Sequence, residues 1–283
     1  MQRNGEYPPP PGWPEWMGLE VAGVIEHAPA GGRWKAGDKV CALLGGGGYA
    51  EKVAAPQDMT LPIPEGLSFS EAAAIPEAFA TSYLNLCLEG GMKEGDTVFI
   101  QAGASGLGMA AIQLAKTLGA KVVTTVGSEA KADFVRGLGA DVVINYKKDP
   151  VADILAKHPA DIAMDCVAGG DLGAYLKTVA RGCRWIVIAT LGGAKTELDM
   201  NDYFRRGVKL IGSTLRSRTS EMKAEILSEL ESKLWDKFSS AKIKSVIYRT
   251  LPMAKAEEAH CILEKQQNLG KVVLTLEKTK GNL

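Results

Sequence analysis

The sequence is poor in the residues that hold chains together through disulfides or metal ions. Its 283 residues include five cysteines, which lie far apart, form no C-x-x-C pair and leave an odd number, so a disulfide framework is not expected. The three histidines, His27, His158 and His260, are scattered singly along the chain. We interpret each as a surface or packing residue, because a metal site needs several ligands close together. The sequence therefore predicts no bound metal.

An excess of charge and long apolar runs are also missing. Lys and Arg together number 33, as do Asp and Glu, so no basic surface for nucleic acid is predicted. No apolar run of roughly eighteen residues occurs, and the opening MQRNGEYPPPPG lacks the apolar segment of a signal peptide. These absences favour a cytoplasmic protein that binds a small molecule and has neither a membrane nor a nucleic-acid partner.

The chain does have enough apolar sequence for two lobes. Hydrophobic residues make up 46% of the chain, and a chain of this length usually forms more than one core. Residues 1–76 are rich in Gly, Pro and short alternating runs, which favour a β-rich lobe. From Thr97 onward, apolar runs of strand length alternate with helical stretches, at 98–100, 121–126, 142–145, 161–165 and 185–189. This alternation predicts an α/β fold with a doubly wound, buried parallel sheet.

The end of the chain is expected to return to the first lobe. After an apolar run at 208–213, the pattern predicts helices over Glu221–Phe238 and Ala254–Glu264 and a strand at 272–276. We therefore assign residues 1–76 and 220–283 to the β-rich domain and residues 77–219 to the doubly wound domain.

A glycine-rich loop, QAGASGLG at 101–108, follows a predicted strand and opens a predicted helix. At such a helix N-terminus, free N–H groups and the helix dipole attract phosphate, and glycines keep Cβ atoms out of the way. We predict that the pyrophosphate of a dinucleotide is bound by Gly103, Ser105, Gly106 and Leu107. The spacing is G-x-x-G-x-G rather than G-x-G-x-x-G, so a tight turn without a ligand is the alternative. Leu107 also interrupts the G-x-S-x-G nucleophile motif, which disfavours a serine hydrolase.

The second predicted strand ends about 20 residues beyond this loop, where NAD-binding proteins place a carboxylate for the ribose. The sequence there is GSEAK, with no carboxylate at the tip of the strand. A ribose 2′-phosphate fits better, bound by Gly127, Ser128, Lys131 and, after the third strand, Tyr146. NADPH is thus favoured over NADH. In the alternative, Ser128 only caps its helix, Lys131 is solvated and Glu129 turns toward a ribose.

Segments along nearly the whole chain resemble one family. They are QRNGEYPPPPG, GLEVAGVI, GDKVCALLGGGGYAE, LPIPEGLSFSEAAAIPEAFATSY, LGADVVINYKK, GSTLRSR and GKVVL. With the glycine loop, they resemble the medium-chain dehydrogenase/reductase superfamily, in its zinc-free quinone oxidoreductase (zeta-crystallin-like) branch. The resemblance implies a Rossmann cofactor domain, a GroES-like catalytic domain built from both chain ends, a cleft between them, and a homodimer formed by edge-strand pairing. Family members carry an opening strand segment before the position that matches Met1, so the catalytic domain is expected to lack its opening strands.

The resemblance also implies individual roles. Thr81 in FATSY and the backbone at Ala189 and Leu191 would flank the nicotinamide, although Thr81 is equally suited to helix packing. Zinc-dependent relatives have G-H-E where this chain has Gly-Leu-Glu at 18–20, and leucine cannot replace an imidazole ligand.

Hydride transfer without a Lewis acid favours a conjugated acceptor, a quinone or an enone, whose electrons delocalise. The family has a tyrosine facing the nicotinamide in the segment GEYPPPPG, so Tyr7 is our candidate proton donor. Packing of Tyr7 against the proline run is the alternative. For Arg216 and Arg218 in TLRSR, contact with the substrate or a phosphate and solvation in a loop are the two alternatives, and we assign neither residue a role.

The sequence thus favours an NADPH-dependent quinone oxidoreductase. An enoyl or alkenal double-bond reductase of the same superfamily is the second hypothesis. A dinucleotide-binding protein without turnover, crystallin-like or a sensor, is the third.

Overall fold

A computed structural model describes residues 2–276, and the chain divides into two compact units. Unit 1 joins Met1–Ala80 to Leu215–Leu283, as far as these segments are described, and unit 2 is Thr81–Thr214. The expected limits of the doubly wound domain, 77 and 219, lie a few residues outside those of unit 2.

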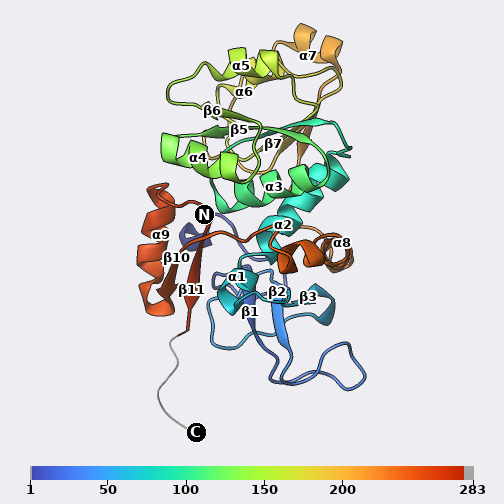
Figure 1. The fold of residues 1–283 in the computed structure, drawn as a ribbon, viewed down its shortest axis with the longest axis vertical. Helices are drawn as coiled ribbons and strands as arrows, with labels where there is room; N and C mark the ends of the chain where they lie inside the picture. Colours follow the sequence, from blue (N-terminus) through green and yellow to red (C-terminus); the bar gives the residue numbers. More distant parts are fainter. Residues whose placement is uncertain (1, 277–283) are drawn as a thin grey trace. The chain divides into compact units, whose positions relative to one another are not determined.

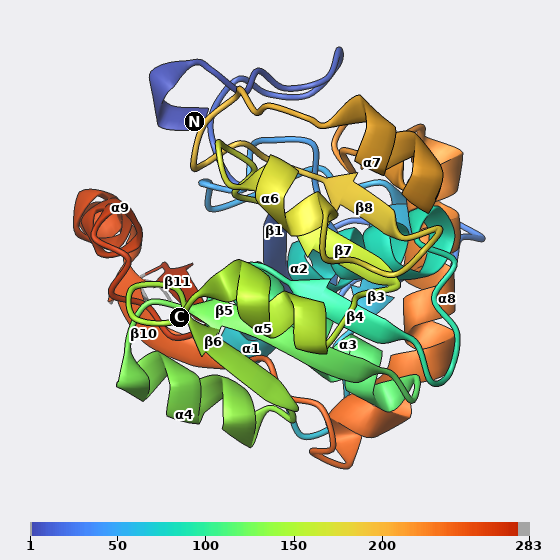
Figure 2. The ribbon, with the colours of Figure 1, turned by 90° about the horizontal axis from the view of Figure 1, so that it is seen from above.

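Unit 2 is built on a parallel sheet, which has six strands within the described residues. Its strands are β4 (Thr97–Ile100), β5 (Lys121–Val126), β6 (Val142–Asn145), β7 (Ile162–Asp165), β8 (Arg184–Val187) and β9 (Lys209–Gly212). Their order is β6-β5-β4-β7-β8-β9 (Figure 2). The chain adds β5 and β6 on one side of β4 and then crosses to add β7, β8 and β9 on the other side, so the strand order reverses between β4 and β7. This is the Rossmann order, in which ligands bind outside the carboxyl ends of the strands where the order reverses.

Helices cover both faces of this sheet, with α3 and α4 on one face and α5 and α6 on the other (Figure 1). The helical elements of unit 2 are η3 (Leu84–Glu89, a π-helical turn), α3 (Gly106–Thr117), α4 (Glu129–Gly137), α5 (Val151–Lys157), α6 (Leu172–Leu176) and α7 (Met200–Arg206). Beneath α5 and α6, Phe99 and Trp185 form the centre of a buried core with Leu155 and Leu176. Because both faces are covered, the central strands β4, β5 and β7 are buried along most of their length and are mainly apolar.

Unit 1 contains strands in two small sheets, β1-β2-β3 and β10-β11. The strands are β1 (Glu20–Val24), β2 (Lys39–Leu43), β3 (Thr60–Pro62), β10 (Ile247–Pro252) and β11 (Lys271–Thr275). The helical elements are η1 (Gln2–Asn4), η2 (Gln57–Met59), α1 (Phe69–Ala73), α2 (Pro76–Tyr83, which runs into unit 2), α8 (Ser220–Ser239), η4 (Met253–Lys255) and α9 (Ala256–Glu264).

The two ends of the chain meet inside unit 1. Phe79 in α2 packs edge-on against Phe238 in α8, with ring centroids 4.9 Å apart. The Glu20 carboxylate of β1 pairs with Lys271 of β11. Helix α9 packs on β10 and β11 through a small apolar core that includes Ile262. The tail of the chain therefore belongs to the same unit as its beginning.

The predicted elements are confirmed with small shifts at their ends. The predicted helix at 221–238 is α8, the predicted helix at 254–264 is α9, and the helix after the glycine loop is α3. Among residues 2–276, no helix combines the length and the apolar character needed to cross a bilayer.

Candidate cofactor site and proton donor

The glycine loop lies at the carboxyl end of β4 and leads into α3, which is twelve residues long. Ser105 caps the helix, because its hydroxyl accepts a hydrogen bond from the amide of Gly108 at 3.0 Å, and its carbonyl accepts one from the amide of Met109. Within the described residues, the amides of Gly106 and Leu107 have no acceptor. Both residues are half-buried, so these donors, at the positive end of the helix dipole, fit a diphosphate.

Two glycines of this loop, Gly103 and Gly108, are needed for packing within the protein. A Cβ on Gly103 would lie 2.2 Å from Thr124 Oγ1 in β5, and one on Gly108 would lie 2.4 Å from the carbonyl oxygen of Ala102. A Cβ at either position would therefore meet neighbouring protein atoms. The missing side chains let the loop, the adjacent strand and the start of the helix approach one another.

A buried carboxylate links the two strands at which the sheet order reverses. Asp165, at the end of β7, is fully buried. Its Oδ1 accepts hydrogen bonds from Gln101 Nε2 at 2.9 Å and from the amides of Val167 and Ala168, and its Oδ2 accepts one from Trp185 Nε1 at 2.9 Å. Four donors offset the cost of burying this charge. The sequence analysis missed Asp165, although an acidic residue that ends a wholly apolar strand is a detectable signal.

Two alanines in these loops adopt left-handed backbone conformations, which are uncommon for residues with a Cβ. Ala102 has a φ of 55° and Ala168 a φ of 53°. The amide of Ala102 donates to Thr125 Oγ1 at 3.1 Å, and that of Ala168 donates to Asp165 Oδ1 at 2.8 Å. Side chains thus hold both loops in shape beside the amides of α3.

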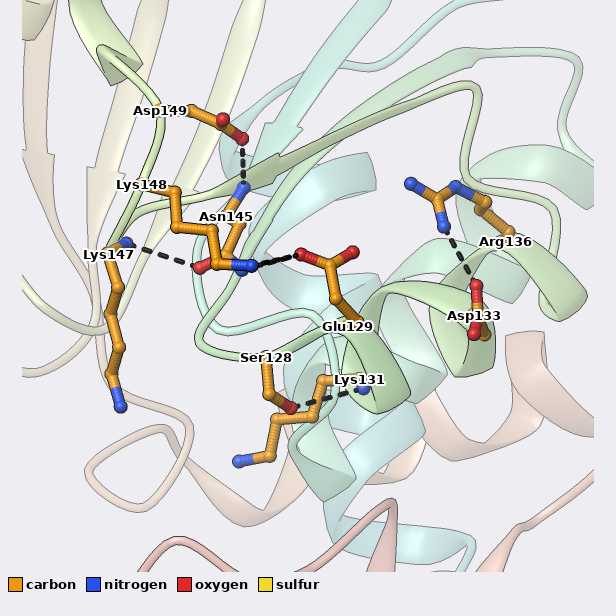
Figure 3. A network of polar contacts seen from close by, with 9 residues as sticks. All are labelled: Ser128, Glu129, Lys131, Asp133, Arg136, Asn145, Lys147, Lys148 and Asp149. Carbon is orange, nitrogen blue, oxygen red and sulfur yellow. Dashed lines mark hydrogen bonds and ion pairs between the residues drawn. The ribbon is translucent and has the colours of Figure 1, made fainter.

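Two of the residues predicted to bind the ribose phosphate, Ser128 and Lys131, lie at the start of α4, directly after β5 (Figure 3). Ser128 caps α4 by accepting a hydrogen bond from the amide of Lys131. Gly127 allows Tyr146 to approach, since a Cβ there would lie 2.7 Å from the Tyr146 hydroxyl. Lys131 is half-buried rather than fully solvated, and burial lowers the pKa of its ammonium. Gly127, Ser128, Lys131 and Tyr146 therefore form one group.

Two further charged residues, Glu129 and Lys147, lie near the end of β5. Glu129 is held by Lys148 at 3.0 Å and by Asn145 at 3.2 Å, and the bond from Lys148 lowers the pKa of its carboxyl. Lys147, which the sequence analysis did not select, adds a second ammonium whose charge also lowers the pKa of Lys131. In Figure 3 the ammonium groups of Lys131 and Lys147 extend away from Glu129.

The residues expected near the nicotinamide lie at separate places in unit 2. Thr81 is in α2, where its carbonyl accepts a hydrogen bond from Asn85 Nδ2 at 2.7 Å. Ala189 and Leu191 follow β8. The Leu191 side chain is 71% exposed, and its amide already donates to the carbonyl of Cys166. A nicotinamide contact at Leu191 would therefore use its carbonyl.

The expected proton donor, Tyr7, lies in unit 1 and is half-buried. Its ring stacks beneath the guanidinium of Arg216, whose Cζ is 4.3 Å from the ring centroid. Burial raises the pKa of the phenol, Glu77 raises it further, and Arg216 lowers it. Of the two alternatives for Arg216, a solvated loop position does not apply, because the residue is 8% exposed and its guanidinium donates to the carbonyl of Gly45.

The acidic residue that follows Leu19 is used for structure. Glu20 pairs with Lys271 and also accepts a hydrogen bond from the amide of Glu77 at 2.9 Å. The described residues contain no cluster of three His, Cys, Asp or Glu side chains suited to a metal. His260 donates to or accepts from the Tyr49 hydroxyl at 3.0 Å, whereas His27 is 92% exposed.

The strand order and glycine loop of unit 2, together with the small sheets of unit 1, define a two-domain dehydrogenase or reductase with a Rossmann fold. Two family models match the chain, one described as alcohol dehydrogenase GroES-like domain over residues 1–65 and one as zinc-binding dehydrogenase over residues 106–232. Quinone oxidoreductase of Rattus norvegicus is 30% identical over 281 residues, which cover 97% of this chain and 84% of that protein. The chain belongs to the medium-chain dehydrogenase/reductase superfamily and is an oxidoreductase.

Solved structures give the same family. The Escherichia coli quinone oxidoreductase in complex with NADPH has a TM-score of 0.85 at 28% identity, over 96% of this chain and 85% of that one. The CurF ER cyclopropanase from the curacin A biosynthetic pathway has a TM-score of 0.80 at 26% identity, over 92% of this chain and 78% of that one. A part of the lovastatin diketide synthase of Aspergillus terreus is 33% identical over 275 residues, 92% of this chain but 11% of that protein.

Proposed function

We propose that this oxidoreductase uses NADPH to reduce a quinone or another conjugated carbonyl compound without a metal ion. The observation that carries the proposal is the pair of amides of Gly106 and Leu107, left without acceptors in the described residues, at the N-terminus of α3 and beside the point where the sheet order reverses. The quinone oxidoreductases among the relatives support the choice of acceptor.

Unit 2 would bind the cofactor along the carboxyl ends of its strands. The amides of Gly106 and Leu107, with the backbone of Gly103 and Ser105, would hold the diphosphate. Thr81 and the backbone at Ala189 and Leu191 would hold the nicotinamide. When bound, the nicotinamide supplies a hydride, and the protein orients it and excludes water.

The choice of NADPH over NADH follows from charge at the end of β5. The carboxylate of Glu129 is bonded by Lys148 and Asn145, and these contacts compete with binding of a ribose. The ammonium groups of Lys131 and Lys147, which extend away from Glu129 in Figure 3, supply two cations that suit a 2′-phosphate.

Exchange of either cation tests this choice. Lys131→Gln and Lys147→Gln should each weaken NADPH binding about tenfold, because a charge-assisted contact with phosphate is lost, and should leave NADH binding within about twofold. Calorimetry measures both affinities. Lys157→Gln, at an exposed lysine at the end of α5, is the matched control. An equal loss for both cofactors would contradict the assignment of the phosphate site.

Metal-free chemistry is supported by the donor set. Leu19 offers no ligand, and the Glu20 carboxylate is committed to Lys271 and to the amide of Glu77. Tyr7 would then donate the proton that the acceptor oxygen needs, since its phenol is a weak acid held in a half-buried place.

Turnover itself is measured by the loss of reduced nicotinamide absorbance when NADPH is mixed with an ortho- or para-quinone, with and without a metal chelator. We expect equal rates in both cases, and Tyr7→Phe should lower the rate about 100-fold with little effect on the NADPH affinity. Loss of activity with the chelator would overturn the metal-free mechanism. An unchanged rate in Tyr7→Phe would remove this residue from the chemistry.

A second candidate function is reduction of an enoyl or alkenal double bond. The match to the lovastatin diketide synthase and the likeness to a solved structure described as JamJ enoyl reductase favour it. Consumption of NADPH with an enone or enoyl thioester, but not with quinones, would select this function. Tight NADPH binding without consumption by either acceptor would select a dinucleotide-binding protein without turnover.

We also propose that the protein forms a homodimer through the edge of the unit 2 sheet. The edge strand β9 is mostly exposed, and its Leu210 is an exposed apolar side chain. Size-exclusion chromatography with light scattering measures the mass of the particle in solution. Leu210→Lys should lower this mass toward that of a single chain.

A further inference from the structure

Arg216 is a buried arginine that three separate segments hold in place. Its Nε and Nη2 donate to the carbonyl of Gly45 at 3.1 and 2.9 Å, and its Nη1 donates to the carbonyl of Tyr7. Its own carbonyl accepts a hydrogen bond at 2.8 Å from Lys223, a buried lysine in α8. Both the guanidinium and the backbone of Arg216 are therefore fixed, which is unusual for an arginine in a loop.

The flat face of the same guanidinium covers the ring of Tyr7. The distance from Arg216 Cζ to the ring centroid, 4.3 Å, lies within the range of a cation–π contact. A planar fork satisfies the two carbonyls with its edge while its face remains on the ring, an arrangement that an ammonium group does not allow. The Tyr7 ring is therefore held by a charge as well as by packing.

The charges around the phenol have opposite effects. Burial and then the Glu77 carboxylate of α2 raise the pKa of Tyr7, whereas Arg216 lowers it. Lys223 donates to the carbonyl of Arg216. Burial lowers the pKa of Lys223, and the Glu77 carboxylate raises it. Without Arg216, a phenolate at Tyr7 would form half-buried next to a carboxylate.

We propose that Arg216 is a positioning residue for the proton donor, which fixes the Tyr7 ring and stabilises the phenolate that remains after proton transfer. This inference rests on the proposed function, in which Tyr7 is the donor. The Tyr7 O–H bond breaks, its electron pair stays on Tyr7 Oη, and an O–H bond forms on the acceptor oxygen. The two electrons of the reduction come from the hydride of NADPH, and water returns the proton to Tyr7 before the next turnover.

The test measures the acidity of Tyr7 directly. With 3,5-difluorotyrosine at position 7, the phenol titrates at lower pH, where the protein stays folded, and 19F NMR reports the midpoint. Arg216→Met should move this midpoint up by at least about one pH unit, since an opposite charge at such distances shifts a pKa by about one to three. Glu77→Gln should move it down, and Arg216→Lys should give an intermediate value because it keeps the charge but loses the fork.

Opposite shifts in the two variants separate stabilisation of the phenolate from loosened structure. A purely structural role of Arg216 and Glu77 would expose the ring in both variants and move both midpoints the same way. Arg249→Met, at an exposed arginine of the same unit paired with Glu258, is the matched control and should leave the midpoint unchanged. In the natural chain, Arg216→Met should also lower kcat about tenfold with an unchanged NADPH affinity, because the donor becomes a weaker acid.

The two proposals fail in different ways. A wild-type chain that consumes no NADPH with either acceptor overturns the proposed function. An active wild-type chain in which Arg216→Met leaves both the Tyr7 midpoint and kcat unchanged overturns the inference about Arg216 alone.

Discussion

A hydrogen atom in place of a side chain at Gly103 allows the carboxyl ends of β4 and β5 to approach. The Thr124 hydroxyl fills the place that a Cβ would take, and it donates a hydrogen bond to the carbonyl of Ile100 at 2.7 Å. This contact explains the first glycine of the loop without reference to a ligand, although its consequence is the position of the amides that follow.

Gly103→Ala should therefore lower the free energy of unfolding by about 1–3 kcal/mol, because the new methyl group has to displace Thr124 or the loop. Denaturant unfolding measures the change, and calorimetry with NADPH should show weaker binding in the same variant. Gly137→Ala in α4 is the matched control, since a Cβ there meets nothing within 4 Å. Equal stability of the two variants would contradict the packing role of Gly103.

The environments of some single residues could be predicted from the sequence, and those of others could not. The start of a helix directly after the glycine loop follows from local patterns, and α3 confirms it. The burial of Arg216 does not follow, because TLRSR has no local feature that separates a buried arginine from a solvated one. Its carbonyl partners, Tyr7 and Gly45, are more than 170 residues away along the chain.

The loops after β4 and β7 are joined by the Asp165 carboxylate, which bonds side chains from both neighbouring strands. Gln101 follows β4 and Trp185 lies in β8, so one residue connects three consecutive strands of the sheet. The same carboxylate holds the left-handed turn at Ala168. The geometry of the loops at the proposed diphosphate site thus depends on a fully buried carboxylate.

Asp165→Asn should lower the free energy of unfolding by about 2–4 kcal/mol, because an amide cannot accept all four hydrogen bonds and leaves buried donors unsatisfied. NADPH affinity should fall in the folded variant as the two loops loosen. Denaturant unfolding and calorimetry measure the two effects, and Asp153→Asn, at an exposed position in α5, should change neither. An Asp165→Asn variant with wild-type stability would contradict the role of the carboxylate.

The elements themselves were largely predictable, and the reason is physical. Strands buried on both faces appear as short apolar runs, and the runs at 121–126 and 142–145 coincide with β5 and β6. The apolar face of α3 and its glycine stop are local as well, since helix periodicity spans a few residues. The bonds between loops are not local, so the partners of Asp165 could not be predicted even though its place at the end of an apolar strand was visible.

Across the molecule, each unit buries a cysteine that has to stay protonated. Cys41 in unit 1 and Cys183 in unit 2 are almost completely buried, and burial raises the pKa of each thiol from 9.0 to about 12. In the unfolded chain these thiols lose their protons near pH 9, whereas in the folded chain they keep them until about pH 12.

Between these values the unfolded state binds fewer protons, so stability should fall as the pH rises. Each thiol should lower the free energy of unfolding by about 1.4 kcal/mol per pH unit above pH 9, with no effect below it. Denaturant unfolding at pH 8, 9 and 10 under reducing conditions measures the slope. Cys183→Ala should reduce the fall of the unfolding free energy with pH by about 1.4 kcal/mol per pH unit. An unchanged pH dependence in this variant would show that the Cys183 thiol does not remain protonated.

Local patterns in the chain were enough to establish the alternating strands and helices, the glycine loop, and the lack of a carboxylate at the tip of the second strand. Each of these depends on neighbours within a few turns or a few strand residues, so it is visible in order along the chain. Tertiary structure alone decided which distant polar groups meet: Asp165 with Gln101 and Trp185, Glu20 with Lys271, and Arg216 with Tyr7. A buried charge is stable only where the whole fold supplies its partners, and those partners follow from packing between elements rather than from the spacing of residues.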